Sequence, residues 1–174
     1  MDIRNSKGIT LVALIITIVV LLIIASITIY SGKGTIKEAN LEAIKTNMLL
    51  IKAKARECVE EVNFKLGPNK QKQGEIATIR NGENGNDGVY TSEGLKKVEE
   101  AIYQGISIPD SIPTDETVYW VAEEALKNWG LDKIELENGE AYFVKFDEDN
   151  VKVEVYNNLG FDGKYALSEI EGLE

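Results

Sequence analysis

The stretch KGITLVALIITIVVLLIIASITIY, residues 7–30, decides the fold that the sequence predicts. From residue 9 to residue 30 every side chain is apolar except five with hydroxyl groups: Thr10, Thr17, Ser26, Thr28 and Tyr30. Hydroxyls can bond back to the preceding helical turn, so they are compatible with a helix in lipid. As a helix, this run would be roughly 33 Å long, enough to cross a hydrocarbon core of about 30 Å. We therefore expect a transmembrane helix over residues 9–30.

The helical pattern continues beyond this run. After Gly32 and Gly34, apolar residues recur at steps of three or four, with Lys and Glu between them: Ile36, Ala39, Ala43, Ile44, Met48, Ile51, Ala55, Cys58, Val59, Val62 and Leu66. This spacing is typical of a helix with one apolar face, and Gly67-Pro68 is a stop signal. The sequence predicts one long helix over residues 9–64, with a transmembrane half (9–30) and an amphipathic half (35–64).

Residues 65–174 are predicted to form a globular α/β head. The patterns favour a short strand at 75–80, helices over 95–104 and 116–129, strands over 133–137, 141–146 and 151–157, and a last short strand near the end. The expected fold class is α+β, in which the long helix packs on a head with an antiparallel β-sheet and two short helices. The segment NGENGNDG, residues 81–88, does not fit a calcium loop, because the twelfth position counted from Glu83 is Gly94.

Composition excludes several functions. The chain has no histidine, which excludes His-based catalysis and His metal sites. It has one cysteine, Cys58, which cannot form an internal disulfide and is expected to be a small buried hydrophobe. The net charge is −10, and 23 acidic against eight basic residues lie from Gln73 onward, which disfavours nucleic acid as a partner. The acidic run 147–149 falls in a predicted hairpin turn, so we expect no enzyme activity, no metal site and no cofactor.

The order of a short basic leader, Gly8 and an apolar helix resembles the processing site of type IV prepilins and pseudopilins. The resemblance covers residues 1–64 and implies a leader peptide (1–8), a long helix (9–64) and an extracellular head (65–174) with a type IV pilin-like fold. It implies that a prepilin peptidase cuts between Gly8 and Ile9 and that Ile9 becomes the N-methylated end. Arg4 and Lys7 supply the leader charge, which also favours a cytoplasmic N-terminus.

The same resemblance implies that copies assemble through the first part of the long helix. The residues expected in that contact are Ile9, Leu11, Val12, Ala13, Leu14, Ile15, Ile16, Ile18, Val19, Val20, Leu21 and Leu22. Ala13 stands where the family usually has a glutamate that pairs with the N-terminal amine. This departure favours a minor pilin or pseudopilin, or a variant of the kind found in Gram-positive bacteria, over a major pilin.

The function expected from these observations is a structural subunit of a type IV pilus or a type II secretion-like filament. The expected partners are the membrane, a prepilin peptidase and other pilin or pseudopilin subunits, and the expected location is a cell-surface filament after assembly. Two alternatives stay open: an unprocessed single-pass membrane-anchored extracellular binding domain that keeps residues 1–8, and a cleaved secretory protein. In the head, Trp120 falls off the apolar face of the predicted helix over 116–129, which makes it a candidate contact with a neighbouring subunit.

Overall fold

The structure, a computed structural model, describes the backbone of residues 4–173 and the side chains of residues 17, 18, 21 and 37–173. The chain divides into two units, Met1–Glu42 and Ala43–Glu174, which are treated separately below. Helix α1 (Arg4–Leu66) supplies the described backbone of the first unit and the first residues of the second. The second unit contains every strand that the structure describes.

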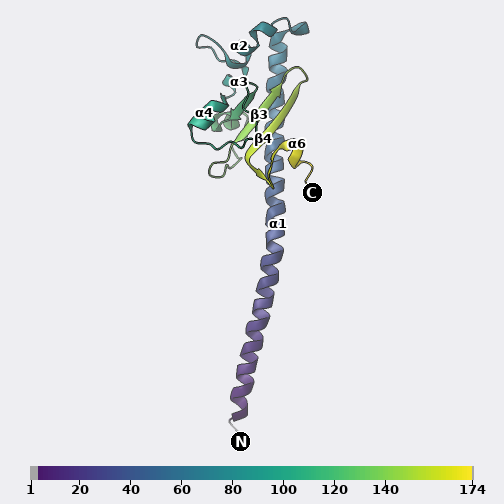
Figure 1. Ribbon diagram of the computed structural model, residues 1–174, viewed down its shortest axis with the longest axis vertical. Coiled ribbons are helices and arrows are strands. Elements are labelled where there is room, and N and C mark those ends of the chain that lie inside the picture. The colour runs from purple at the N-terminus through teal and green to yellow at the C-terminus, as the bar shows by residue number, and fades with distance from the viewer. Residues whose placement is uncertain (1–3, 174) are drawn as a thin grey trace. The chain divides into compact units, whose positions relative to one another are not determined.

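After α1, the second unit consists of short elements, some of which are labelled in Figure 1. The helical elements are the 3₁₀ turns η1 (Pro68–Lys70) and η2 (Gln73–Glu75), and α2 (Ile76–Asn81), α3 (Val89–Ser92), α4 (Val98–Tyr103), α5 (Glu123–Asn128) and α6 (Leu167–Ile170). The strands are β1 (Leu95–Lys97), β2 (Val118–Val121), β3 (Tyr142–Asp147), β4 (Lys152–Phe161) and β5 (Lys164–Ala166). They form one antiparallel sheet in the order β1-β2-β3-β4-β5.

One face of this sheet packs against α4 and the connector that follows it. Trp120 of β2 lies opposite Phe143 of β3, and successive side chains along a strand point to opposite faces. Both rings belong to a buried cluster that also contains Val98 and Ala101 of α4 and, from the connector, Ile112. The cluster fixes the position of α4 on the sheet.

The other face packs against the part of α1 that belongs to the second unit. The buried stripe of this part consists of Met48, Ile51, Ala55, Val59, Val62 and Leu66, all fully inaccessible to solvent. Asn47 donates a hydrogen bond from Nδ2 to the hydroxyl of Tyr142 on β3 at 3.4 Å. Complete burial of an aliphatic side chain contributes about 1.5–3 kcal/mol, so this stripe is a major part of the core.

The predicted fold class is wrong in its transmembrane half. Within the residues that the structure describes, no helix has the length and apolar composition needed to cross a membrane. From Lys37 onward, α1 carries eleven Lys, Arg, Asp or Glu residues in 30 positions, which is too many charges for a helix in lipid. Of the predicted span 9–30, all side chains except those of residues 17, 18 and 21 lie outside the described ones. The predicted antiparallel sheet is present and has five strands, but two of them, β1 and β2, lie in segments that were predicted to be helical.

The prediction of two short helices is also wrong, because the described part of the second unit has five after α1. The predicted helix over 116–129 is strand β2 followed by α5, and the predicted helix over 95–104 is strand β1 followed by α4. The predicted strand at 75–80 is helix α2, and residues 133–137 form no regular element. The β3–β4 hairpin was predicted correctly, with Val153 and Val155 buried.

Candidate functional site

The predicted processing site lies outside the residues whose side chains the structure describes. This holds for Gly8 and Ile9, for the leader charges Arg4 and Lys7, and for these predicted assembly residues: Leu11, Val12, Ala13, Leu14, Ile15, Ile16, Val19, Val20 and Leu22. Two predicted assembly residues are described, Ile18 and Leu21, with 48% and 65% of their surface exposed. The predicted cut and the predicted helix contact therefore remain predictions from the sequence.

Trp120 does not lie on a helix. It is the third residue of β2, paired with Lys96 and Phe143, and only 8% of its surface is exposed. The sequence predicted a single helix over residues 116–129, a range that covers both β2 and α5. In that helix the Trp120 ring would lie off the apolar face. In a strand with both faces covered, the same ring is a core residue, so the reason for expecting an exposed contact disappears.

The outer face of α1 in the second unit exposes apolar side chains at two places. Leu49 and Leu50 keep 46% and 44% of their surface exposed, and Phe64, about 21 Å further along the helix, keeps 86%. Exposed glutamates such as Glu60 lie between the two places. Because Leu49 and Leu50 stand between the buried residues Met48 and Ile51, the helix is in contact with the sheet on one side and with solvent on the other.

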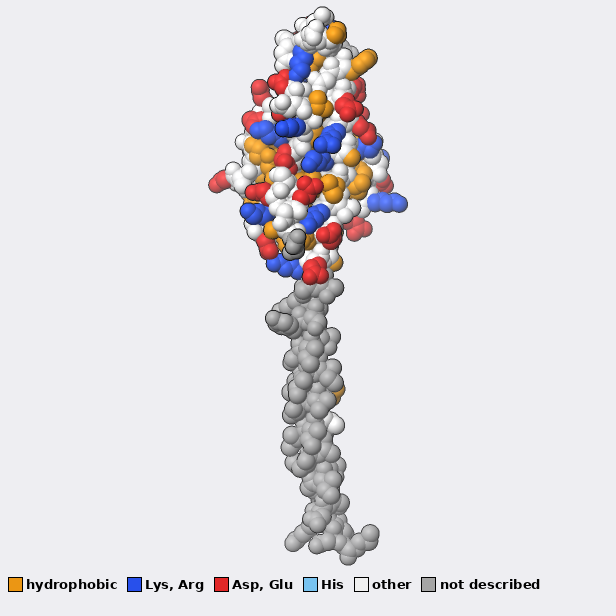
Figure 2. All heavy atoms as spheres, turned by 90° about the vertical axis from the view of Figure 1, so that its right-hand side faces the viewer, with side chains coloured by type: hydrophobic (Ala, Val, Ile, Leu, Met, Phe, Trp, Pro, Cys, Tyr) orange, Lys and Arg blue, Asp and Glu red, His pale blue; other side chains and the backbone are white. Residues whose placement is uncertain are grey.

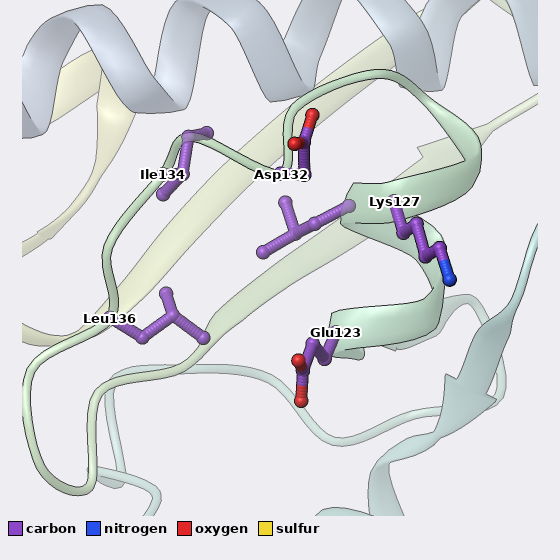
Figure 3. A pocket seen from close by; sticks show the side chains of 6 residues that line it. Glu123, Lys127, Asp132, Ile134 and Leu136 are labelled. Atoms are coloured by element: carbon purple, nitrogen blue, oxygen red, sulfur yellow. The ribbon is translucent and has the colours of Figure 1, made fainter.

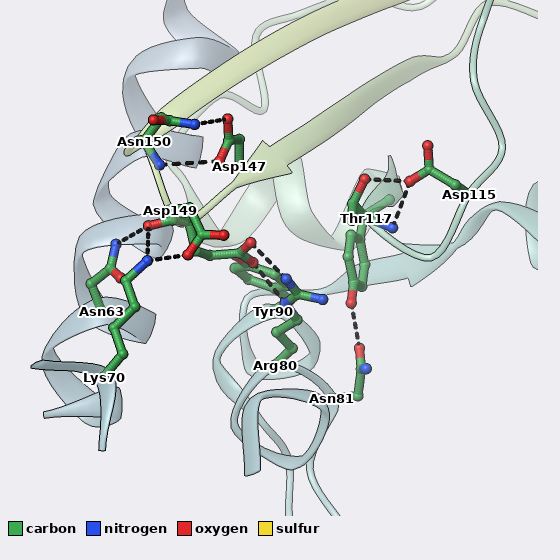
Figure 4. A network of polar contacts seen from close by, with 12 residues as sticks. Asn63, Lys70, Arg80, Asn81, Tyr90, Asp115, Thr117, Asp147, Asp149 and Asn150 are labelled. Carbon is green, nitrogen blue, oxygen red and sulfur yellow. Dashed lines mark hydrogen bonds and ion pairs between the residues drawn. The ribbon is translucent and has the colours of Figure 1, made fainter. Parts of the chain in front are cut away.

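A buried ion pair joins α2 to the β3–β4 turn (Figure 4). Arg80 donates from Nε to Oε1 of Glu148 and from Nη2 to Oε2, each at 2.6 Å. The hydroxyl of Tyr90 donates to Oε1 of the same carboxylate at 2.7 Å. Acidic residues of a hairpin turn are usually in contact with water, but Glu148 is only 5% exposed. With both oxygens hydrogen-bonded, the carboxylate ties α2 to the β3–β4 turn.

Backbone contacts extend the same network to α1. The carbonyl of Glu148 accepts hydrogen bonds from Nδ2 of Asn63 at 3.1 Å and from Nζ of Lys70 at 3.3 Å, and Lys70 also pairs with Asp149. The ring of Tyr90 stacks on Phe146 with centroids 4.1 Å apart. Nothing local in the sequence marks Arg80 and Glu148 as partners, because 68 residues separate them.

Cys58 is buried, as expected from the sequence, with 4% of its surface exposed. Its thiol donates to the carbonyl of Lys54 at 3.5 Å. Burial, together with the negative charges of Glu93, Glu61 and Glu57, raises the pKa of the Cys58 thiol to about 12. A thiol that stays protonated at neutral pH is a poor nucleophile, so Cys58 packs rather than reacts.

No group of three or more His, Cys, Asp and Glu side chains in the described part of the chain could hold a metal ion. Every buried side-chain nitrogen and oxygen in that part has a hydrogen-bond partner. Comparison of the chain with protein-family models, with curated proteins and with solved structures finds no match. The likeness to type IV pilins consequently rests on the residues quoted from the sequence.

Proposed function

We propose that this chain is a structural subunit, of the minor pilin or pseudopilin kind, of a type IV pilus or a type II secretion-like filament. In this proposal a prepilin peptidase removes residues 1–8, and copies associate through α1. One observation supports it: helix α1 contains the Lys7-Gly8-Ile9 sequence near its start, and its later part forms part of the core of the head with the outer face exposed to solvent.

The two faces of α1 support separate roles in such a subunit. The stripe that includes Met48, Ile51 and Val59 holds the head together, so association of copies does not have to disturb it. The apolar side chains of Leu49 and Leu50 on the other face are available to another helix. Each Å² of apolar surface that such a contact removes from water contributes about 25 cal/mol, which favours side-by-side packing of helices.

The composition of the head supports a structural role rather than catalysis. Its charged side chains are mostly exposed and acidic, which keeps an assembled surface hydrated and soluble. The described polar clusters are internally satisfied, as the pair of Arg80 and Glu148 illustrates. Ala13, at the position of the family's usual glutamate, is the reason for proposing a minor rather than a major subunit.

The experiment uses cells that make the chain together with a prepilin peptidase. Gly8→Val should block removal of residues 1–8 and abolish filaments in the sheared surface fraction, because a branched side chain replaces the residue before the cut. Gly34→Val is the matched control, since it makes the same substitution away from the cut, and it should leave processing intact. A wild-type chain that keeps residues 1–8 and forms no filament would refute the proposal and favour an unprocessed surface binding domain.

A further inference from the structure

A groove beside α1 contains a local excess of positive charge on an otherwise acidic head. It has a volume of about 440 Å³ and lies between α1 and the β3–β4 hairpin. The residues that line it are Lys52 and Arg56 from α1, Lys145 and Asp147 from β3, and Lys152, Val153 and Glu154 from β4. We call this feature the cationic groove. Figure 2 shows basic side chains among acidic ones on one face of the second unit.

The carboxylates of the cationic groove are already engaged within the head. Asp147 accepts hydrogen bonds from the backbone N–H and the Nδ2 of Asn150, at 3.1 and 2.8 Å. Glu154 accepts one from the backbone N–H of Ser168 at 3.1 Å. Lys145 is paired with Asp115 at 2.8 Å. These hydrogen bonds hold the two carboxylates in place but leave their charge, so the groove, lined by four cations and two carboxylates, keeps an excess of positive charge.

Two cations of the groove have no partner in the described part of the chain. The side chains of Lys52 and Arg56 make no hydrogen bond or ion pair there. Lys152 lies opposite Asp147 in the β3–β4 pairing, and its charge helps to lower the pKa of that carboxyl. Arg56 is exposed and Lys52 is half-buried, so both can reach a ligand. Two unpaired cations on one side of a groove form a surface that fits carboxylates of a partner.

A complementary acidic surface lies around α5 and the loop after it. The segment 123–140 has six acidic and two basic residues. A pocket of about 370 Å³ in this segment is lined by Glu123, Lys127 and Asp132 above the apolar side chains Leu126, Ile134 and Leu136 (Figure 3). Apolar floors of this kind suit the stems of Lys and Arg, whose charged ends would meet Glu123 and Asp132. We call this feature the acidic pocket.

The cationic groove and the acidic pocket lie on different sides of α1. The end of α5 meets α1 at Lys54 and Cys58, together with Asn128 and Trp129. On an α-helix, Lys52 and Lys54 are about 200° apart around the axis. A contact between two different, complementary surfaces is heterologous and repeats from copy to copy, and it continues as an open helical array where the rotation does not close into a ring.

We infer that the cationic groove of one copy binds the acidic pocket of a second copy of this chain. The inference rests on the proposed function, and it names the head contact that accompanies packing through α1. The partner is a second copy because the same chain supplies the complementary charge and because a heterologous contact suits a filament. Such a contact is screened by salt, so assembly should weaken as ionic strength rises.

The test compares full-length variants in the same cells, by the amount of chain in the sheared filament fraction relative to total chain. Lys52→Glu/Arg56→Glu should lower this fraction at least fivefold, and so should Glu123→Lys/Asp132→Lys. The variant with all four substitutions should recover most of the wild-type fraction, because the two surfaces have exchanged sign. Lys72→Glu/Lys164→Glu is the control for charge alone, since both lysines are exposed and lie outside the groove.

Each outcome decides the inference. Loss in both double variants with recovery in the quadruple variant supports it. If the wild-type chain forms filaments and the Lys52→Glu/Arg56→Glu variant has the same filament fraction, the inference is overturned and the proposed function is left intact. Loss without recovery in the quadruple variant would also overturn it, because the groove would then bind something other than the acidic pocket. Absence of any filament from the wild-type chain would overturn the proposed function and this inference together.

Discussion

Removing Arg80 should destabilise the head far more than removing an exposed cation. In Arg80→Met, Glu148 loses two charged hydrogen bonds of 2.6 Å and keeps only the one from Tyr90. Each hydrogen bond to a charged group contributes about 1.5–3 kcal/mol, and breaking a buried ion pair by removing one partner costs about 3–5 kcal/mol. With Glu148 only 5% exposed, we expect a loss of about 3–5 kcal/mol in the free energy of unfolding.

Urea unfolding of the full chain, followed by tryptophan fluorescence, measures this loss. Both tryptophans of the chain, Trp120 and Trp129, are buried in the head at 8% and 7% exposure, so their emission reports its unfolding. Lys145→Met is the matched control: it also breaks a Lys/Arg–carboxylate pair, but the two side chains there are 39% and 46% exposed. For that variant we expect less than about 1 kcal/mol.

A second substitution separates charge burial from packing. Glu148→Gln keeps an acceptor for Tyr90 but carries no charge, so Arg80→Met should cost much less in that background than in the wild-type chain. The reasoning would be refuted if Arg80→Met cost less than about 1 kcal/mol, as the exposed control should. It would also be refuted if the cost were the same in both backgrounds, because the buried charge would then contribute nothing.

The remaining predictions concern a thiol, a glycine and a carboxylate. The pKa of about 12 at Cys58 predicts that a thiol-specific reagent labels the native chain at least a hundredfold more slowly at pH 8 than the urea-unfolded chain; equal rates would contradict the burial. Gly82→Ala should cost more stability than Gly139→Ala in the same urea assay. Both glycines have positive φ, but only at Gly82 would a Cβ approach another atom, the carbonyl oxygen of Asn86, to 1.9 Å; equal losses would contradict this difference. The hydrogen bond from Lys145, with that from Thr117, lowers the pKa of Asp115 from 3.8 to about 2. The stability from this pair should be fully present above pH 3.8 and disappear as the pH falls toward 2, and it should be small because Asp115 is exposed. An NMR titration in which Lys145→Met left the pKa of Asp115 at about 2 would show that the assignment of its cause is wrong.

The parts of the fold that were predicted correctly are those with an unambiguous period. The steps of three and four in α1 placed Met48, Ile51, Val59 and Val62 on one face, and all four are fully buried. The alternation in β4 placed Val153 and Val155 in the core. In both elements one face is buried over several helical turns or several strand residues. The period of the apolar residues in the sequence therefore identifies which side chains are buried.

The prediction failed where a strand and a helix follow each other without a break. Residues 118–128 are apolar at enough positions to fit a helical stripe, but β2 is buried on both faces and α5 starts two residues after it ends. Strand β2 is held by pairing with β1 and β3, and that pairing is not visible in its own sequence. The Arg80–Glu148 pair was missed for the same reason, since the two residues meet only after the sheet has formed.

The charge pattern around α1 could be predicted only in part. The alternation of Lys and Glu along residues 37–65 indicates a wet face, but it does not say which cations keep a partner. Whether Lys52 and Arg56 form ion pairs depends on β3 and β4, and in the described part of the chain neither of them does. The proposed head contact could therefore be inferred only from the structure, whereas the proposed cut after Gly8 was inferred from the sequence alone.

The most direct test of the central claim is the N-terminus of the native chain. The measurement is intact mass together with N-terminal sequencing of the protein purified from the cells that make it. Our account predicts a chain that begins at N-methylated Ile9 and lacks residues 1–8. A chain that begins at Met1 or Asp2 would contradict the account, because a filament subunit of the proposed class would not keep its leader.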